Sequence, residues 1–407
     1  MQNRNPLTKF MTTNIQQRIQ SIDILRGIVM VIMALDHVRD YFHIYAWTDD
    51  PLNLETTTPE LYFTRYVTHF CAPIFVFLSG VSIYLQSLRK TKPELSAFLI
   101  KRGLWLIFVE LVIVAFAWSF NPAFERFPLG VIWAIGVSMF LLGFLIRLPY
   151  KLILGLGLII VFGHNLLDFP EATTGFQGGF WLDLLHSSKW TSYEIMENRN
   201  LIIAYPFLPW LGLMMVGYCT GQLFSPQFDA VRRNKLLTQM GIGLFVLFVI
   251  LRGINVYGDP VAWSPQRNGL YTFFSFMNIH KYPPSLLYMC VTIGCALLLL
   301  PHLEKLENRF TKIMVIFGRT AFFYYILHLY LIHILATISF YIHGHTLEKI
   351  AEGESVFKWK FVVPGEGFGL LGVFLIWIFV IVCLYPLCKW YDNYKTKHKE
   401  KWWLSYL

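Results

Sequence analysis

Ionisable residues are concentrated in one otherwise apolar segment near the N-terminus, residues 21–43 (SIDILRGIVMVIMALDHVRDYFH). The segment is long enough to cross a bilayer as a helix, and ionisable side chains are costly inside a bilayer. Such groups usually face the interior of a helix bundle or a wet cavity, and they mark a functional site. The candidates in this segment are Asp23, Arg26, Asp36, His37, Arg39 and Asp40.

The spacing of Arg26 and His37 places them within roughly 20° of one helix face and about 16 Å apart along the axis. An imidazole titrates near neutrality, so His37 can accept a proton from an attacking hydroxyl or amine, with Asp36 or Asp40 orienting it. Local pairs of Asp23 with Arg26 and of His37 with Asp40 are expected. Arg26 can hold a phosphate or polarise a thioester carbonyl. The alternative is that Asp23 and Arg26 only anchor the helix at the cytoplasmic interface.

A second polar cluster interrupts the aromatic segment 317–333 (FGRTAFFYYILHLYLIH). If this segment is one helix, Arg319 and His333 nearly share a face and His328 points elsewhere. The cluster either contributes to the site or makes hydrogen bonds between helices. His69, at the outer mouth of the second predicted helix, either lines the same pocket as the first cluster or is structural.

The composition is that of an integral membrane protein. Of the 407 residues, 56% are hydrophobic and only 14% are charged, and the mean hydropathy is +0.51, whereas soluble proteins carry roughly 25% charged residues. Continuous apolar runs predict helices rather than barrel strands. We predict an all-α polytopic membrane bundle of about ten transmembrane helices. Their expected ranges are 22–46, 69–88, 99–118, 128–147, 150–167, 202–223, 236–256, 284–301, 311–340 and 367–390.

The lysines and arginines gather in the connections on one side of this predicted bundle and in both tails. Because positive residues are retained in the cytoplasm, both termini are predicted to be cytoplasmic. We divide the chain into a tail at 1–20, a transmembrane domain at 21–390 and a tail at 391–407. The opposite loops are long and aromatic. Their tryptophans form either stacking platforms for a sugar or an interfacial belt: Trp47, Trp181, Trp190, Trp263 and Trp359.

Several classes of partner are not expected. The six cysteines lie in or beside apolar runs and should pack as small hydrophobes, and no CxxC or Cys/His ligand spacing is visible, so no metal is predicted. Basic cytoplasmic loops are enough to explain the net charge of +9, so binding of nucleic acid is not expected. The first twenty residues lack the apolar core of a signal peptide, so the first helix should act as its own insertion signal.

The segments RIQSIDILRGIVMVIMALDHVRDYF and HFCAPIFVFLSGVSIYL resemble the heparan-alpha-glucosaminide N-acetyltransferase catalytic-domain family, including its bacterial members. GRTAFFYYILHLYLIH and the C-terminal tail are similar to the bacterial branch. The resemblance implies a multi-pass enzyme of the bacterial cytoplasmic (inner) membrane. Such an enzyme takes an acyl group, usually acetyl, from cytosolic acyl-CoA and delivers it to a sugar on the far side. Asp23, Arg26 and Gly27 match the opening motif of the family.

The resemblance leaves two candidates for the base. His37 stands where the lysosomal member has an asparagine and where membrane acyltransferases of surface polysaccharides have their key histidine. The catalytic histidine of the lysosomal member lies further along, and His43 is the nearest histidine here. Direct transfer and an acyl-histidine intermediate both stay open. Arg102 and other basic side chains of the inner loops would bind the CoA phosphates.

The predicted function is therefore acyl transfer from acyl-CoA to a sugar hydroxyl or amine of a cell-envelope glycan or glycolipid. The lipid bilayer is the other expected partner, and a homodimer is one arrangement left open. The alternative is a proton-coupled transporter in which Asp36, His37, Arg319 and His333 form a relay. A third reading is a non-catalytic protein that keeps the fold for partner binding. In that case no cavity should reach His37.

Overall fold

The computed structural model describes residues 19–405 except 174, 188–189 and 349–359. The predicted N-terminal tail up to residue 18 and Trp359 thus lie outside the described residues. The helices are α2 (Gln20–Phe42), α3 (Pro59–Thr68), α4 (Cys71–Ser87), α5 (Lys92–Val109), α6 (Ala115–Ser119), α7 (Val131–Leu145), α8 (Tyr150–Gly163), α9 (Asp168–Glu171), α10 (Gly179–Leu185), α11 (Phe207–Thr220), α12 (Ala230–Ile254), α13 (Gly269–Met277), α14 (Leu286–Leu303), α15 (Arg309–Arg319), α16 (Ala321–Ile342) and α18 (Leu370–Lys397).

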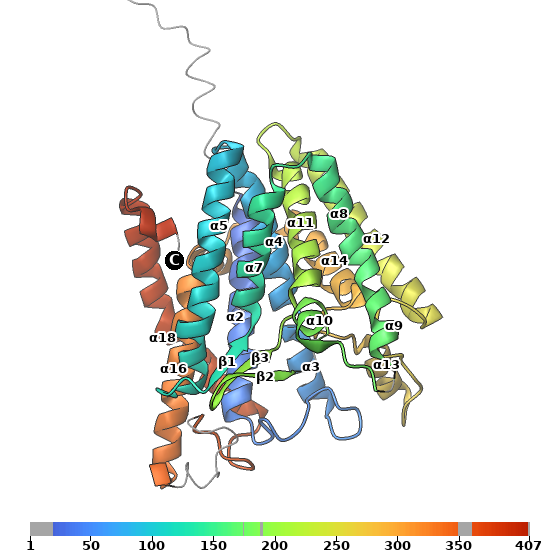
Figure 1. Ribbon diagram of the computed structural model, residues 1–407. Helices are drawn as coiled ribbons and strands as arrows, with labels where there is room; N and C mark the ends of the chain where they lie inside the picture. The colour runs from blue at the N-terminus through green and yellow to red at the C-terminus, as the bar shows by residue number, and fades with distance from the viewer. Residues whose placement is uncertain (1–18, 174, 188–189, 349–359, 406–407) are drawn as a thin grey trace, which may run out of the picture.

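The long helices stand side by side, and α2 lies at the centre of one half of the bundle (Figure 1). It packs against α3, α4, α14, α15, α16 and α18, while α11 joins α4 to α7 and α8. A helix that carries several charges cannot face lipid, so the neighbouring helices must cover it. The start of α2 and the end of α18 lie at the same end of the bundle (Figure 1).

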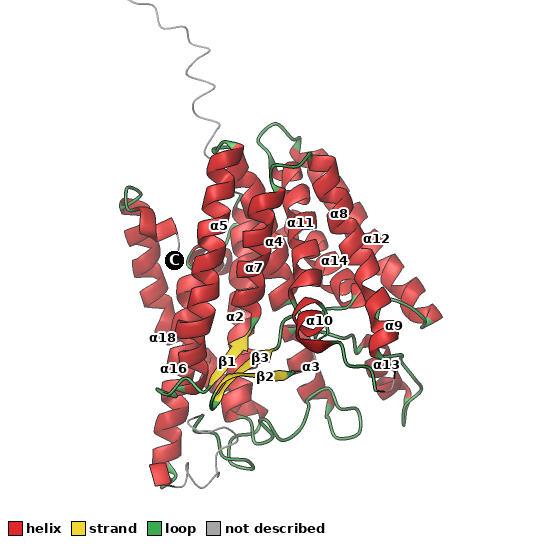
Figure 2. Cartoon of the chain, viewed as in Figure 1, coloured by secondary structure: helices red, strands yellow, loops and turns green. Residues whose placement is uncertain are grey.

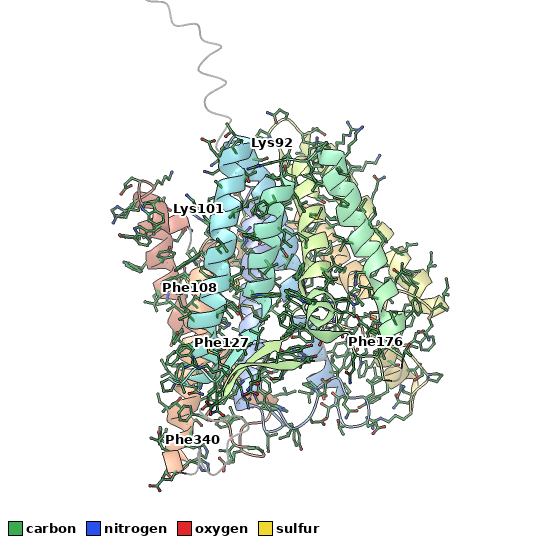
Figure 3. All side chains as sticks on the ribbon, in the orientation of Figure 1. Lys92, Lys101, Phe108, Phe127, Phe176 and Phe340 are labelled. Atoms are coloured by element: carbon green, nitrogen blue, oxygen red, sulfur yellow. The ribbon has the colours of Figure 1, made fainter. Side chains whose placement is uncertain are left out.

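Labelled side chains mark the two ends of the bundle. Lys92 and Lys101 of α5 lie toward one end, and Phe127 and Phe340 lie toward the other (Figure 3). Between these ends, helices such as α12 and α18 expose apolar side chains, among them Ile242, Val246, Leu371, Leu375 and Phe379. Exposed apolar side chains in a band of this kind are suited to lipid contact.

Within the part of the chain that is described, seven helical segments are long and apolar enough to cross a membrane. They begin at Pro59, Tyr150, Phe207, Ala230, Leu286, Ala321 and Leu370. The helix α7 is apolar but shorter, and α2 is interrupted by charges. The protein is thus a multi-pass membrane protein. The count of ten crossings and the cytoplasmic side of the termini stay predictions.

The expected single helix over 311–340 is wrong. The chain breaks at Thr320, where φ is −113° and ψ is 23°, so that α15 ends and α16 begins. The preceding Gly318 presses against α2, because a Cβ atom on it would lie 1.9 Å from the carbonyl oxygen of Asp23. The face shared by Arg319 and His333 on an unbroken helix is therefore lost.

A three-stranded sheet corrects the all-α prediction. It contains β1 (Arg126–Leu129), β2 (Ser192–Met196) and β3 (Arg199–Ile203) in the order β1-β3-β2. β1 and β3 are parallel, and β2 and β3 are antiparallel. The strands are short and lie in segments that we expected to be loop and helix, where the long apolar runs dominate the sequence signal. The sheet sits at the end of the bundle near α3 and α10 (Figure 2).

The closest helix contact, between α2 and α15, yields a test of the packing. A Cβ atom on Gly27 would lie 1.9 Å from the carbonyl oxygen of Met314, so the two backbones touch. We expect Gly27→Ala to force the helices apart and to cost at least about 1 to 3 kcal/mol, since overpacking of a tight core has this effect. The measurement is the thermal unfolding midpoint of the purified protein in detergent.

The matched control is Gly243→Ala in α12, where a Cβ atom would meet no atom within 4 Å. It should be neutral or slightly stabilising, because alanine is the better helix former. Equal midpoints for the two variants would contradict the glycine contact.

Candidate active site

A cavity of about 680 Å³ runs alongside α2 and reaches both polar ends of this helix. Its walls come from α2, α4, α5, α7, α15 and α16, and its far end is closed in by β1, β3 and the loops that carry Trp47, Trp190, Tyr282 and Lys360. Arg26 lines one part of the cavity and His37 another. The helix therefore presents both groups to one space, as their spacing predicts.

The end of the cavity near the chain termini is basic. Arg26 donates from Nη1 to Asp23 Oδ1 (3.1 Å), the pair expected from the sequence, and from Nη2 to Ser82 Oγ (2.9 Å). Arg319 pairs with Asp392 of α18 through Nε (2.9 Å). Further cationic side chains on the wall are Arg102 and Lys395. Among the described residues, four cationic side chains therefore gather at this end of the cavity.

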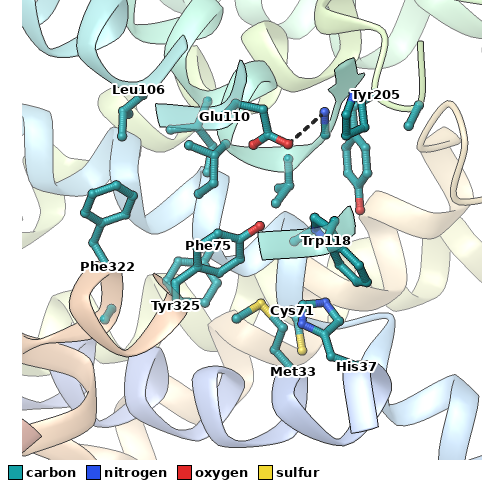
Figure 4. A pocket seen from close by; sticks show the side chains of 18 of the residues that line it. Met33, His37, Cys71, Phe75, Leu106, Glu110, Trp118, Tyr205, Phe322 and Tyr325 are labelled. Carbon is teal, nitrogen blue, oxygen red and sulfur yellow. Dashed lines mark hydrogen bonds between the residues drawn. The ribbon is translucent and has the colours of Figure 1, made fainter. Parts of the chain in front are cut away.

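An apolar stretch separates this basic end from His37. In Figure 4, Phe322 and Leu106 lie on the side away from His37, while Met33 and Cys71 lie close to it and Phe75 and Tyr325 lie between. These side chains offer contact surface but few hydrogen bonds. The middle of the cavity therefore suits a thin, largely apolar chain rather than a free ion.

A histidine pair forms the chemical centre of the cavity. Nδ1 of His37 lies 2.7 Å from Nε2 of His328, and Nδ1 of His328 lies 3.0 Å from the carbonyl oxygen of Tyr324. A carbonyl only accepts, so neutral His328 carries its proton on Nδ1 and accepts at Nε2. His37 must then donate from Nδ1, which leaves the lone pair on its Nε2. The arrangement prepares His37 as a proton acceptor.

His328 thus takes the orienting role that we had expected of Asp36 or Asp40. Asp36 is held by Arg65, whose Nη1 lies 2.6 Å from Oδ1 and 2.5 Å from Oδ2, and by Arg39 Nη2 at 2.9 Å. Asp40 accepts from Arg39 at 2.7 Å, so the predicted pair of Asp40 with His37 is replaced. The ion network fixes α2 against α3 beside the site, and Asp36 and Asp40 still line the cavity.

Glu110 is a cavity residue that the sequence analysis missed. It lies in a π-helical turn, Glu110–Val114, that joins α5 to α6, and it is 1% exposed. Its carboxylate accepts from the backbone N–H groups of Gly130 and Trp133, both at 3.2 Å, at the start of α7 (Figure 4). A single Glu in an apolar run is the signal that could have found it.

The far mouth of the cavity combines cations with aromatic rings. Lys360 Nζ lies 3.7 Å from the ring centre of Trp47, 4.9 Å from that of Trp118 and 5.1 Å from that of Tyr41. Other basic and aromatic side chains on this wall are Arg39, Arg65, Arg126, Trp190, Lys281 and Tyr282. Trp47 and Trp190 thus line the mouth, whereas Trp181 is 78% exposed and Trp263 donates to the carbonyl of Arg252.

Four predicted histidines lie outside the cavity wall: His328 stands behind His37, and the other three lie elsewhere. His43 follows α2 and accepts from the backbone N–H of Tyr45 at 3.3 Å. His69 is buried at the end of α3, where its ring packs against Tyr288. His333 bonds through Nδ1 to the carbonyl oxygen of Ala117 at 2.7 Å and stacks on Phe120. These contacts are typical of side chains that contribute to packing.

The fold and the site define the class: a helical membrane protein whose internal cavity extends from a basic end to His37, a half-buried histidine that pairs with the buried His328. The family model for heparan-alpha-glucosaminide N-acetyltransferase, catalytic, matches residues 18–253, more than half of the chain. The chain therefore belongs to this family, as its sequence resemblance indicated, and the family is one of membrane acetyltransferases. A comparison with curated proteins finds no match.

The buried lysine at the mouth gives a pH dependence that can be measured. The pKa of Lys360 is lowered to about 7, chiefly by burial; Asp40 acts to raise it and Arg126 to lower it. Between pH 7 and pH 10 the unfolded chain binds a proton at this lysine that the folded chain has lost. The free energy of unfolding should therefore rise with pH over this range.

The check is the thermal midpoint between pH 7 and pH 10 for the wild type and for Lys360→Met. The variant should lose most of the rise. Lys101→Met, which removes an exposed lysine, should keep it. A rise of equal size in Lys360→Met would show that this lysine is not its source.

Proposed function

We propose that the protein transfers an acetyl group from cytosolic acyl-CoA, across the width of the bundle, to a sugar hydroxyl or amine of a cell-envelope glycan. The observation that carries the proposal is the chain of hydrogen bonds from His37 through His328 to the carbonyl of Tyr324, beside a cavity that extends from His37 to a basic end. From this chain we infer that His37 keeps a lone pair on Nε2. Family membership supports the transferase class. We assign the basic end to the cytoplasm of a bacterial cell, with both chain termini on that side.

The donor enters from the basic end in this proposal. Arg26, Arg102 and Arg319 offer positive charge for the phosphates of coenzyme A, since guanidinium groups bind phosphate strongly. The pantetheine arm, a chain of methylenes and amides, extends through the apolar stretch. The helical rise between Arg26 and His37 is about 16 Å, so the thioester can reach the histidine while the phosphates stay at the basic end.

The sugar acceptor enters from the far mouth of the cavity in this proposal. Rings such as Trp47 and Trp190 provide flat surfaces on which a sugar can stack. Cations on this wall, among them Arg126 and Lys281, favour an acceptor that carries a negative group. The two substrates then meet at His37 from opposite sides, which suits direct transfer in a ternary complex.

The chemical step needs one base. As the acceptor oxygen or nitrogen bonds to the thioester carbon, its proton passes to Nε2 of His37. The carbon–sulfur bond breaks, and coenzyme A leaves as a thiolate that takes up the proton. His37 is then neutral again. His328 accepts the hydrogen bond from Nδ1 of His37 throughout the reaction, so it positions His37 and does not take part in the proton transfer.

The transporter alternative lacks the relay on which it was based. Asp36 is locked by two arginines, Arg319 pairs with Asp392 near the other end, and His333 bonds to a backbone carbonyl. A cavity that reaches His37 also counts against a non-catalytic protein. Acetyl transfer is the function that these contacts support best.

The direct test is release of coenzyme A by purified protein in detergent, with radiolabelled acetyl-CoA and mixed envelope glycans. We expect His37→Ala to lower the transfer rate about 100-fold or more, the usual contribution of a general base. His43→Ala should stay near the wild-type rate, because His43 does not line the cavity. His328→Gln, which can still accept from His37, should retain more activity than His328→Ala and should shift the pH profile.

Loss of transfer in His43→Ala with full activity in His37→Ala would reverse the assignment of the base. The absence of acetyl-CoA binding and turnover with every acceptor would overturn the transferase itself.

Binding of the acyl-CoA donor can be tested with two neighbouring residues of α5, one on the cavity wall and one exposed. Arg102 lines the cavity, and its neighbour Lys101 is exposed. We expect Arg102→Gln to raise KM for acetyl-CoA several-fold with a smaller effect on kcat, because the charge contacts the phosphates in the ground state and the transition state alike. Lys101→Gln should leave both constants unchanged. Equal effects of the two variants would place the phosphates elsewhere.

A further inference from the structure

A cluster of histidine and carboxylate side chains lies apart from the cavity, where α8 ends and the segment leading to β2 begins. His164 starts a 3-10 turn, His164–Leu167, and Asp168 starts α9 directly after it. His186 ends α10 and folds back onto both. The two histidines are 3% and 0% exposed. None of the three residues lines the cavity.

The ligand atom of His186 lies close to those of the other two residues, and Asp168, Glu171 and His186 form a group whose ligand atoms all lie within 4.8 Å of one another. Nε2 of His186 lies 3.0 Å from Nδ1 of His164 and 4.0 Å from Oδ1 of Asp168. With bonds of roughly 2.0 to 2.2 Å to a tetrahedral ion, neighbouring ligand atoms lie about 3.3 to 3.6 Å apart. Shifts of a few tenths of an ångström would therefore bring these atoms to the spacing that such an ion requires.

Neighbouring side chains already orient the ligands. Nδ1 of His186 donates to Oε1 of Glu171 at 2.8 Å, which places the lone pair of that ring on Nε2. Asn165 donates to Oδ2 of Asp168 at 2.6 Å and leaves Oδ1 toward the histidines. Carboxylates behind metal-bound histidines play this part in known metal sites.

An independent observation concerns His164. Its Nδ1 is aimed at His186, and its Nε2 is buried without a hydrogen-bond partner among the described residues. In the metal-free arrangement Nδ1 of His164 therefore donates to the lone pair on Nε2 of His186. Binding of an ion would move that proton to Nε2 of His164 and leave both facing nitrogens as ligands. The bare arrangement packs two buried imidazoles against each other for a single hydrogen bond, whereas a cation would use both lone pairs.

We propose that His164, Asp168 and His186 bind one divalent transition-metal ion, with Glu171 as the positioning residue of His186. Imidazole and carboxylate ligands in a tetrahedral arrangement are typical of Zn²⁺, with water in the fourth position. The charge of the ion would balance the carboxylates of Asp168 and Glu171. This proposal is independent of the proposed acyl transfer.

The ion would stabilise one wall of the far mouth of the cavity. Asn165 also accepts from the backbone N–H of Leu286 at 2.8 Å, so the cluster is tied to the start of α14. His186 lies four residues before Trp190, which lines the cavity. Metal binding would join α8, α14 and the segment leading to β2, and would thereby hold one wall of the mouth in place.

The test uses full-length protein purified with a histidine-free tag, stripped with a chelator and titrated with Zn²⁺ and Co²⁺. We expect one ion per chain, a rise in the thermal midpoint with Zn²⁺, and the intense visible absorption of tetrahedral Co²⁺. His164→Ala and His186→Ala should lose all three signals. Glu171→Gln should still fold and bind about 10- to 100-fold more weakly, as outer partners of metal ligands do.

The control is His302→Ala, which removes an exposed histidine of α14 far along the chain from the cluster and should bind as the wild type does. Binding that is absent from the wild type would overturn the proposal. The same holds for binding that is equal in wild type, His186→Ala and Glu171→Gln. If the alanine variants fail to fold, the affinity of Glu171→Gln and the Co²⁺ spectrum of the wild type decide the question.

Discussion

The structure depends on hiding the charges of one helix from lipid. Asp36 in α2 is buried between Arg39 and Arg65, and removal of both arginines would leave an unpaired carboxylate in an apolar surrounding at a cost of several kcal/mol. At the other end of α2, the glycine contact with α15 lets that helix approach until backbones touch, which brings Arg319 to the same wall as Arg26. The cavity exists because these neighbours surround α2 without filling the space beside its polar face.

The sequence was informative where an interaction is local. The charges of α2, their shared face and the pair of Asp23 with Arg26 all follow from spacing along one helix, and the structure confirms them. Partners from distant segments could not be predicted in this way. His328 meets His37 only because the chain breaks at Thr320 and turns α16, an event that a continuous apolar pattern conceals. The short strands were hidden for a related reason, since four or five residues carry little periodicity.

Distance along the chain also explains why no metal was expected. His164 and Asp168 form a recognisable pair on successive turns, but His186 joins them only after α9 and α10 have reversed the chain. The hydrogen bonds of a buried carboxyl group such as that of Glu110 are equally hard to predict from a sequence, because the donors are backbone groups of another helix. The parts of the site that the sequence reveals are thus side chains on one element, and the parts it conceals are contacts between elements.

The carbonyl of Tyr324, which ends the chain of hydrogen bonds from the histidine pair, affects whether protons can pass along that chain. A cavity that joins two sides of a membrane could pass protons from one histidine to the next and dissipate the electrochemical gradient. In this chain the sequence of hydrogen bonds runs from His37 to His328 and stops at an oxygen that cannot be protonated at ordinary pH. A proton taken up by His37 therefore has no onward path through His328, so this chain of hydrogen bonds supports acid–base chemistry at His37 without itself conducting protons.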